Sequence, residues 1–165
     1  MNKKAVFLVG LSGVGKTTLA RLILDFFRRK GLTPIFFDGN EMYDFQILKP
    51  ENGHDIESRL HRAIHLTKII NWSISQNMIP VVAVIGQPKE ARDYWRKHID
   101  GYFEIYLKAD LSVCVNRDDK NIYSSGRTDI IGRDIIFNEP NNSDLVLDTN
   151  NSTPVELLKY IVEFL

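Results

Sequence analysis

The sequence carries the pattern Gly-x-x-x-x-Gly-Lys-Thr at positions 10–17, as Gly10-Leu11-Ser12-Gly13-Val14-Gly15-Lys16-Thr17. An apolar run of β-prone residues, 5–9, comes directly before it, and a segment with helical periodicity follows it. Glycine-rich backbone can fold tightly with its N–H groups pointing inward, and the positive end of the following helix adds to the attraction for phosphate. In this strand–loop–helix context, the pattern predicts a phosphate-binding P-loop rather than a simple tight turn.

The P-loop assigns roles to individual residues. Lys16 is expected to reach the β and γ phosphates of a nucleotide and to act as a catalytic residue by stabilising the phosphate in transfer. The Thr17 hydroxyl is expected to ligate Mg²⁺. The P-loop residues expected to contact ATP are Gly10, Ser12, Gly13, Val14, Gly15, Lys16, Thr17 and Thr18.

The composition indicates one domain, residues 1–165, that is long enough to bury a proper core. The 21 basic and 21 acidic residues cancel, so no overall field is expected to recruit nucleic acid or an anionic membrane. No segment approaches the roughly 18 consecutive apolar residues of a membrane span. We therefore expect a soluble, cytoplasmic protein. The single cysteine, Cys114, forbids an intrachain disulfide and is expected in the core.

Strand and helix patterns alternate along the chain. Strands are expected at residues 5–9, 33–37, 80–85, 102–107 and 145–148. Helices are expected from the P-loop to about Lys30, at about 55–76 after a polar loop at 49–53, at 89–97, at 110–117 behind an Asp110 cap, and from a capping box at 153–156. This alternation predicts an α/β fold with a doubly wound, parallel five-stranded sheet.

Asp38 directly follows the second expected strand. In an open α/β sheet, ligands bind at the carboxyl ends of the strands, where the P-loop also lies. Asp38 is therefore a candidate catalytic residue. It would either accept a proton from an acceptor hydroxyl or position Mg²⁺, directly or through water, and the sequence leaves both roles open.

Two arginines stand near the start of the long central helix. Arg59 and Arg62 are three residues apart and share a helix face, where two guanidinium groups could grip a phosphate or a sulfate. Solvated surface arginines fit the same pattern. His61 and His65 are also helix neighbours, but no third metal ligand is evident, so no metal site is predicted from them.

Periodicity fades from Asp118 to Asn138, which we call the lid segment. Long irregular segments inside compact domains are usually functional covers, and mobile basic side chains over a phosphate site would exclude water and neutralise developing charge. A solvated surface loop is the alternative. The lid segment is rich in charge, with Lys120, Arg127 and Arg133 alternating with Asp119, Asp129 and Asp134.

The chain resembles the adenylylsulfate (APS) kinases over nearly its whole length. The resemblance rests on residues 10–20, Phe37-Asp38-Gly39-Asn40, residues 114–123 and Asn138-Glu139-Pro140 with residues 145–149. It implies an ATP- and Mg²⁺-dependent kinase that phosphorylates the ribose 3′-hydroxyl of a small nucleotide acceptor and is commonly a homodimer. It also implies that Arg117 contacts ATP.

The sequence departs from the family pattern where that family binds its acceptor. Asn40 replaces the second acid, Tyr43 an arginine, and Ile130 the lid phenylalanine that stacks on the acceptor's adenine. Ile56 stands where the family has an arginine, and Arg59 where it has an asparagine, whereas Arg62 is retained. The family's Phe-Ile-Ser-Pro strand end is replaced by Val84-Ile85-Gly86-Gln87. The expected acceptor contacts are Tyr43, Arg59, Arg62, Ile85, Gly86, Gln87, Lys120, Tyr123, Arg127 and Ile130.

The residues expected to bind ATP match the family pattern, whereas several of those expected to bind the acceptor do not. This difference favours an acceptor other than adenylyl sulfate. The resemblance extends to enzymes that phosphorylate cytidine diphosphoramidate in capsule phosphoramidate synthesis, and we favour that acceptor. An authentic APS kinase is the alternative, and a kinase for another nucleotide or metabolite is a third possibility. A non-catalytic nucleotide-binding switch is a further one, although no Asn-Lys-x-Asp guanine motif follows a strand.

Overall fold

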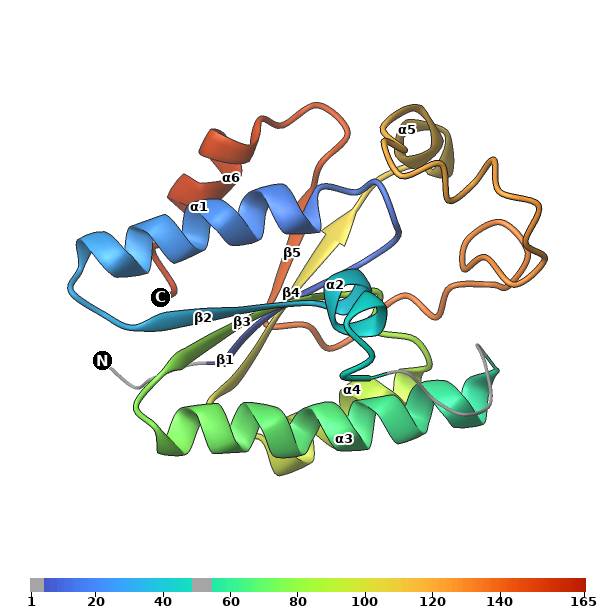
Figure 1. Cartoon of the computed structure of the whole chain (residues 1–165). Helices are drawn as coiled ribbons and strands as arrows, with labels where there is room; N and C mark the ends of the chain where they lie inside the picture. Colours follow the sequence, from blue (N-terminus) through green and yellow to red (C-terminus); the bar gives the residue numbers. More distant parts are fainter. Residues whose placement is uncertain (1–4, 49–54) are drawn as a thin grey trace.

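The computed structural model describes residues 5–48 and 55–165, which form a three-layer α/β fold (Figure 1). All strands run parallel in one sheet in the order β2-β3-β1-β4-β5. The predicted fold class is thus confirmed. The predicted polar loop at 49–53 lies outside the described residues. The strands are β1 (Ala5–Val9), β2 (Pro34–Asp38), β3 (Ile79–Val84), β4 (Tyr102–Lys108) and β5 (Leu145–Asp148).

The long helices cover both faces of the sheet (Figure 1). Helices α1 (Lys16–Arg29) and α6 (Pro154–Ile161) pack on one face, and α3 (Ile56–Ser75) and α4 (Lys89–His98) pack on the other. Two short helices, α2 (Gly39–Asp44) and α5 (Leu111–Asn116), follow the carboxyl ends of β2 and β4. Among the described residues, no helix combines the length and apolar character needed to cross a membrane.

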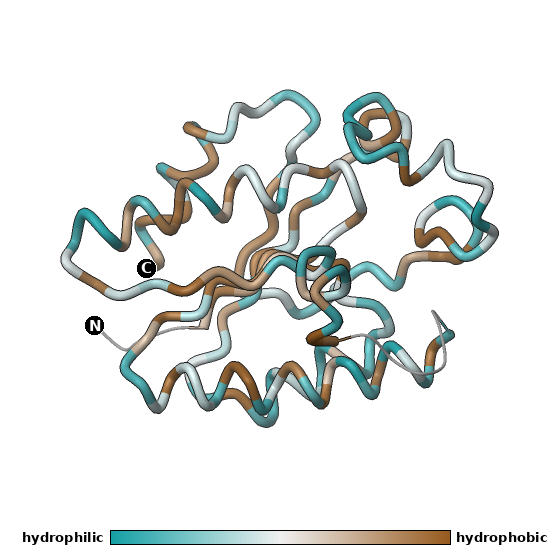
Figure 2. Tube along the Cα trace, viewed as in Figure 1, coloured by the Kyte–Doolittle hydropathy of each residue, from teal (hydrophilic) through white to brown (hydrophobic). Residues whose placement is uncertain are grey.

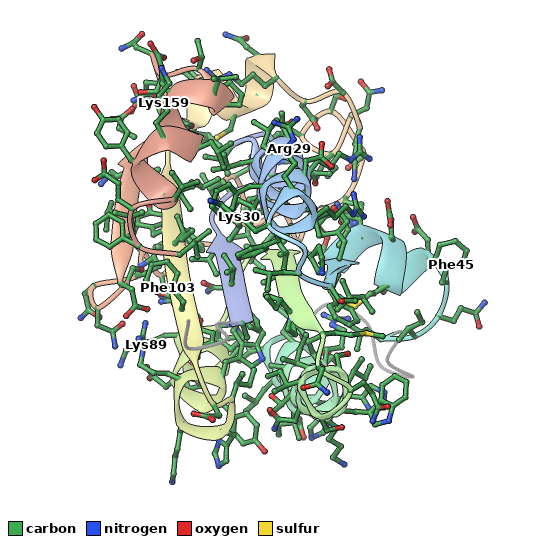
Figure 3. All side chains as sticks on the ribbon, turned by 90° about the vertical axis from the view of Figure 1, so that its left-hand side faces the viewer. Arg29, Lys30, Phe45, Lys89, Phe103 and Lys159 are labelled. Carbon is green, nitrogen blue, oxygen red and sulfur yellow. The ribbon has the colours of Figure 1, made fainter. Side chains whose placement is uncertain are left out.

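The core lies in two clusters, one on each side of the sheet. Successive residues of a strand point to opposite faces, so Val6 and Leu8 join the cluster under α1 and α6, whereas Phe7 and Val9 join the cluster under α3 and α4. Both faces are covered, which explains why β1 and β3 read as continuous apolar runs. Figure 2 shows hydrophobic residues concentrated along the strands, and Figure 3 shows side chains filling the space between the layers.

The strand register brings the carboxyl ends of three strands together. Val9 at the end of β1 is paired with Val84 of β3, and Asp38 at the end of β2 is paired with Ala83. The P-loop leaves the sheet directly after Val9. Asp38 and the P-loop are therefore neighbours, as the position of the two strand ends predicts.

The termini of several elements show the local signals that set them. Helix α1 ends beside Arg29 and Lys30 (Figure 3), and Gly31 follows with a φ of 72°. The predicted capping box at the start of α6 is confirmed, with Thr153 and Glu156 exchanging hydrogen bonds.

One local prediction needs correction, and one short helix was missed. Asp110 stands at the amino end of α5, but its side chain makes no cap hydrogen bond there. Its backbone N–H instead donates to the Asn150 side chain across 2.9 Å. Helix α2 was not predicted at all. Asp38 caps it, accepting hydrogen bonds from the backbone N–H groups of Asn40 and Glu41, and the Asp-x-x-Glu spacing was the available signal.

The lid segment contains no helix or strand within the described part of the chain. Its one regular feature is an isolated bridge between Ile131 and Ile135. It extends beyond the carboxyl edge of the sheet between α5 and β5, on the right of Figure 1. Cys114 of α5 is fully buried, as predicted.

Candidate active site

A cavity of about 710 Å³ opens at the carboxyl ends of the strands. The P-loop, the ends of β2 and β3, the first half of α3 and the lid segment all contribute to its wall. Eleven predicted site residues line it, namely Ser12, Gly13, Gly15, Lys16, Thr17, Thr18, Asp38, Tyr43, Arg59, Arg62 and Arg117. Six more predicted acceptor contacts line it as well, namely Ile85, Gly86, Gln87, Lys120, Arg127 and Ile130.

The P-loop backbone is held in a conformation that its glycines permit. Gly13 has a φ of 76°, and a Cβ atom added there would lie 2.2 Å from the carbonyl oxygen of Cys114. The loop therefore packs directly against the backbone of α5. Of the predicted ATP contacts, Gly10 and Val14 do not line the large cavity; the Val14 side chain is buried instead.

Lys16 points back into the P-loop. Its ammonium group donates hydrogen bonds to the carbonyl oxygens of Gly10 across 2.9 Å and of Leu11 across 2.6 Å. Burial lowers the pKa of Lys16 from 10.5 to about 8, and the nearby Asp38 carboxylate works against that shift. A desolvated cation in a glycine-rich cradle suits a polyphosphate ligand.

Thr17 and Asp38 form the second polar pair of the cavity. The Thr17 hydroxyl donates to Asp38 Oδ2 across 2.7 Å. Asp38 Oδ1 accepts from the backbone N–H of Asn40 across 2.9 Å and of Glu41 across 3.4 Å. The described residues hold no cluster of three or more His, Cys, Asp or Glu side chains suited to a metal. This donor set fits Mg²⁺, which proteins usually bind through one or two side-chain oxygens together with substrate phosphates.

The two arginines of α3 line the cavity, and Arg59 interacts with the lid segment. Burial and the neighbouring Arg62 guanidinium lower the pKa of Arg59, and the Asp129 carboxylate of the lid segment acts in the opposite direction. Arg127 donates to the same carboxylate across 3.0 and 3.2 Å. Both α3 arginines are half-buried in the cavity wall rather than solvated on the surface. Asp129 also lines the cavity and was not predicted as a site residue.

Arg133 does not close over the cavity, contrary to the prediction. Its guanidinium donates to the carbonyl oxygens of Tyr123 and Arg127 and to the Asp134 carboxylate. It is not among the cavity-lining residues. Arg133 therefore holds the lid segment together from within, and charge alternation in the sequence could not distinguish that role from a cavity-facing one.

Tyr123 lies behind the P-loop instead of inside the cavity. It is 6% exposed, and its hydroxyl donates to the Ser12 carbonyl oxygen across 3.0 Å. Its predicted role as an acceptor contact thus gains no support from its position. It fastens the lid segment to the P-loop, and Gly132 adds a second contact because a Cβ there would lie 2.8 Å from the Leu11 side chain.

Arg117 connects the large cavity with a smaller one of about 250 Å³. Its guanidinium donates to the carbonyl oxygens of Thr149 across 3.0 Å and of Asn150 across 3.2 Å. The small cavity lies beside Gly15 and Thr18 at the start of α1. Its place next to the P-loop is compatible with the predicted contact between Arg117 and ATP.

Gln87 lines the cavity, but its side chain is engaged with the end of the lid segment. Gln87 Nε2 donates to Asn138 Oδ1 across 2.8 Å, and the Asn138 backbone N–H donates to Gln87 Oε1 across 3.0 Å. Arg92 of α4, which was not predicted as functional, donates to the carbonyl oxygens of Gly86 and Asn138. Arg92 stands among other charged residues of α4, so the sequence pattern could not indicate that its side chain is buried and bonded to the lid segment.

A P-loop after the first strand of a parallel five-stranded sheet, an acid at the next strand end and an irregular cover together define a P-loop kinase. The family model for adenylylsulphate kinase matches residues 2–148. The chain belongs to this family and is an ATP-dependent kinase. The alternative of a non-catalytic switch is therefore left without support.

Known relatives cover nearly the whole chain. The cytidine diphosphoramidate kinase of Campylobacter jejuni is 30% identical over 155 residues, covering 92% of this chain and 88% of the relative. The probable adenylyl-sulfate kinase of Pyrococcus abyssi is 31% identical over 164 residues, covering 95% and 91%. The Mycobacterium tuberculosis APS kinase, solved in complex with AMPPNP and APS, has a TM-score of 0.89 at 25% identity, covering 98% of this chain and 96% of that one.

Proposed function

We propose that this kinase transfers the γ-phosphoryl group of ATP to the ribose 3′-hydroxyl of cytidine diphosphoramidate. One observation carries the choice of acceptor. The lid residues that line the cavity include no aromatic ring, and the ring of an adenine acceptor would thus find no stacking partner there. Those lid residues are Asp118, Asp119, Lys120, Ile122, Arg127, Asp129, Ile130 and Ile131.

The relatives support two acceptors. The Campylobacter jejuni relative bears the name of a cytidine diphosphoramidate kinase. The second candidate, adenylyl sulfate, is favoured by the Pyrococcus abyssi relative and by the likeness to the APS-bound Mycobacterium tuberculosis structure. In this proposal the choice of acceptor rests on the cavity wall, because both candidates fit the overall fold.

The donor half of the cavity supplies the groups that phosphoryl transfer needs. The P-loop N–H groups and Lys16 would hold the ATP phosphates, and Thr17 with Asp38 would hold Mg²⁺. A bound Mg²⁺ neutralises charge on the β and γ phosphates. In this proposal the Asp38 carboxylate, held in place by hydrogen bonds to both of its oxygens, would organise the metal or accept the proton of the acceptor hydroxyl.

The acceptor half of the cavity supplies positive charge. Arg59 and Arg62 would bind the anionic tail of the acceptor, and Lys120 and Arg127 would neutralise the group in transfer. The acceptor hydroxyl oxygen forms the new bond to the γ phosphorus, and the bond to the β–γ bridging oxygen breaks. ADP leaves with that electron pair, and the hydroxyl proton is released to water.

The wider organisation is proposed on the same basis. Residues 1–165 act as a single kinase domain, and the lid segment closes over the cavity during each cycle. Two copies form a homodimer, as the resemblance to the family implies. Sedimentation of the purified protein would test that last point, because a monomer at micromolar concentration would contradict it.

The acceptor assignment is tested by Mg-ATP-dependent ADP release with cytidine diphosphoramidate and adenylyl sulfate at equal concentrations. We expect a higher kcat/KM with the cytidine compound. A preference for adenylyl sulfate would identify that compound as the acceptor. Absence of ADP release with both compounds would overturn both assignments. The Lys16→Met variant is the matched control for contaminating ATPases, because it lacks the charge that holds the transferred phosphate.

A further inference from the structure

Arg92 joins the acceptor wall of the cavity to the end of the lid segment. The residue lies in the first turn of α4 and is 4% exposed. One arm of its guanidinium donates to the Gly86 carbonyl oxygen, just past the end of β3. The other arm donates to the Asn138 carbonyl oxygen across 2.8 Å. Because the guanidinium is planar and rigid, these two bonds fix the two segments relative to each other.

The end of the lid segment is anchored at neighbouring positions as well. Asn138 exchanges two hydrogen bonds with Gln87, which itself lines the cavity. The Phe137 ring lies against the Tyr106 ring with centroids 6.0 Å apart. Glu139 pairs with Lys108 across 2.8 Å. Three consecutive residues, 137–139, are therefore held by the ends of β3 and β4.

A buried carboxylate lies within electrostatic reach of Arg92. Glu104 of β4 is fully buried and accepts hydrogen bonds from the Tyr102 and Ser143 hydroxyls. Burial lowers the pKa of Arg92, and the Glu104 and Tyr102 side chains work against that shift. Arg96, one helical turn along α4, pairs with Asp144 across 3.2 Å and approaches Glu104 at 3.7 Å.

Arg92 and Arg96 thus share one charge network but differ in what they reach. Both interact electrostatically with Glu104, but of the two arginines only Arg92 donates hydrogen bonds to Gly86 and Asn138 among the described residues. A role limited to neutralising Glu104 would be common to the two residues. A positioning role predicts that substitution of Arg92, but not of Arg96, weakens acceptor binding.

We propose that Arg92 is a positioning residue that locks the acceptor wall, Gly86 and Gln87, to the carboxyl end of the lid segment. The carboxyl end of the lid segment then stays fixed, and the acceptor wall stays preformed. The guanidinium itself is absent from the cavity lining, so it acts through the backbone that it holds. The effect on acceptor binding rests on the proposed function, whereas the effect on the lid end does not.

The kinetic test compares Arg92→Met with Arg96→Met in the full chain. Arg92→Met is expected to raise the acceptor KM by about tenfold or more while the ATP KM stays within about twofold of wild type. Arg96→Met is expected to leave both KM values within about twofold, although it disturbs the same charge network. Arg92→Lys keeps the positive charge but lacks the planar guanidinium that bonds both segments at once. Its acceptor KM should therefore lie between those of wild type and Arg92→Met. Equal KM changes in the two Met variants would overturn the proposal.

Hydrogen exchange tests the proposal without any acceptor. In wild type, the Asn138 N–H donates to Gln87 Oε1, so exchange at the Asn138 amide should be slow. Arg92→Met should speed that exchange by roughly tenfold, and Arg96→Met should leave it unchanged. Unchanged exchange in folded Arg92→Met would overturn the lock. Wild-type protein inactive with both acceptors, yet with the expected exchange pattern, would refute the proposed function and leave the lock standing.

Discussion

The Thr17 hydroxyl donates a hydrogen bond to the Asp38 carboxylate across 2.7 Å and so links the P-loop helix to the end of β2. The same carboxylate caps α2 through its other oxygen. One buried side chain, 3% exposed, therefore positions the hydroxyl that we propose as a Mg²⁺ ligand and the first turn of the helix that carries Tyr43. Asp38 thus combines a structural role with its proposed catalytic role.

Asp38→Asn is expected to lower kcat by roughly 10²–10⁴-fold with little change in the ATP KM. The amide keeps one oxygen and the shape of the side chain but loses the negative charge opposite Thr17. Steady-state ADP release at saturating acceptor checks this. Thr17→Ser, which keeps the hydroxyl, is the control and should retain activity within about tenfold of wild type. Near-normal turnover in Asp38→Asn would remove Asp38 from the mechanism.

ATP affinity is expected to fall as the pH rises through 8. Burial lowers the pKa of Lys16 to about 8 in the free enzyme, so its ammonium is mostly charged below that pH and mostly neutral above it. Polyphosphate binds the charged form, so the Kd of Mg-ATP should rise by about tenfold between pH 7 and pH 9. Isothermal titration calorimetry measures this dependence.

Lys16→Arg provides the control for the pH experiment. Arginine stays charged throughout this range, so any remaining pH dependence in this variant comes from the nucleotide or from other residues. We expect weaker ATP binding in Lys16→Arg, with a flat Kd from pH 7 to pH 9. A wild-type curve as flat as that of the variant would show that the lysine stays charged and would refute the lowered pKa.

Gly13→Ala is expected to destabilise the fold far more than Gly15→Ala. Both glycines have positive φ, which costs about 1–2 kcal/mol for alanine. A Cβ at Gly13 would also lie 2.2 Å from the Cys114 carbonyl oxygen, whereas a Cβ at Gly15 meets nothing within 4 Å. We expect Gly13→Ala to lower the free energy of unfolding by about 3 kcal/mol or more. Urea denaturation compares the two, and equal losses would contradict the close packing of the P-loop on α5.

The sequence predicted the sheet well because the elements that build it carry strong, local signals. Apolar runs such as β1 can be read without knowing what covers them, and the P-loop identifies the strand and the helix on either side of it. Helix α2 was missed because it is short and begins with Gly39 and Asn40, which are poor helix formers. Only the Asp38 cap marks it.

The candidate site was predictable only in part, for a related reason. Residues that line the cavity from the P-loop and from α3 follow motif spacing or helical periodicity. The contacts of Asn138 with Gln87 and Arg92 join residues 51 and 46 positions apart, and no local pattern encodes them. Arg127 and Arg133 illustrate the same limit, since one lines the cavity and the other binds lid carbonyls although both stand in one charged stretch.

Ile130 gives the most direct test of acceptor choice. Its side chain is 4% exposed, belongs to the core cluster under α1 and also lines the cavity. Ile130→Phe should shift the ratio of kcat/KM values towards adenylyl sulfate, because a ring there can stack on adenine. Aromatic pairs contribute about 0.5–1.5 kcal/mol beyond buried area, so the expected shift is roughly two- to thirteenfold.

Ile130→Leu separates stacking from a simple change of shape. Leucine conserves the volume of isoleucine and should cost less than about 1.5 kcal/mol of stability, without offering a π face. Competition assays with both acceptors in one reaction give the ratio directly and are insensitive to the fraction of active enzyme. If Ile130→Phe and Ile130→Leu move the ratio equally, or if neither moves it, the side chain at position 130 does not select the acceptor base. A change in the kcat/KM ratio that occurs only in Ile130→Phe would show that the absence of an aromatic ring at position 130 selects against adenylyl sulfate.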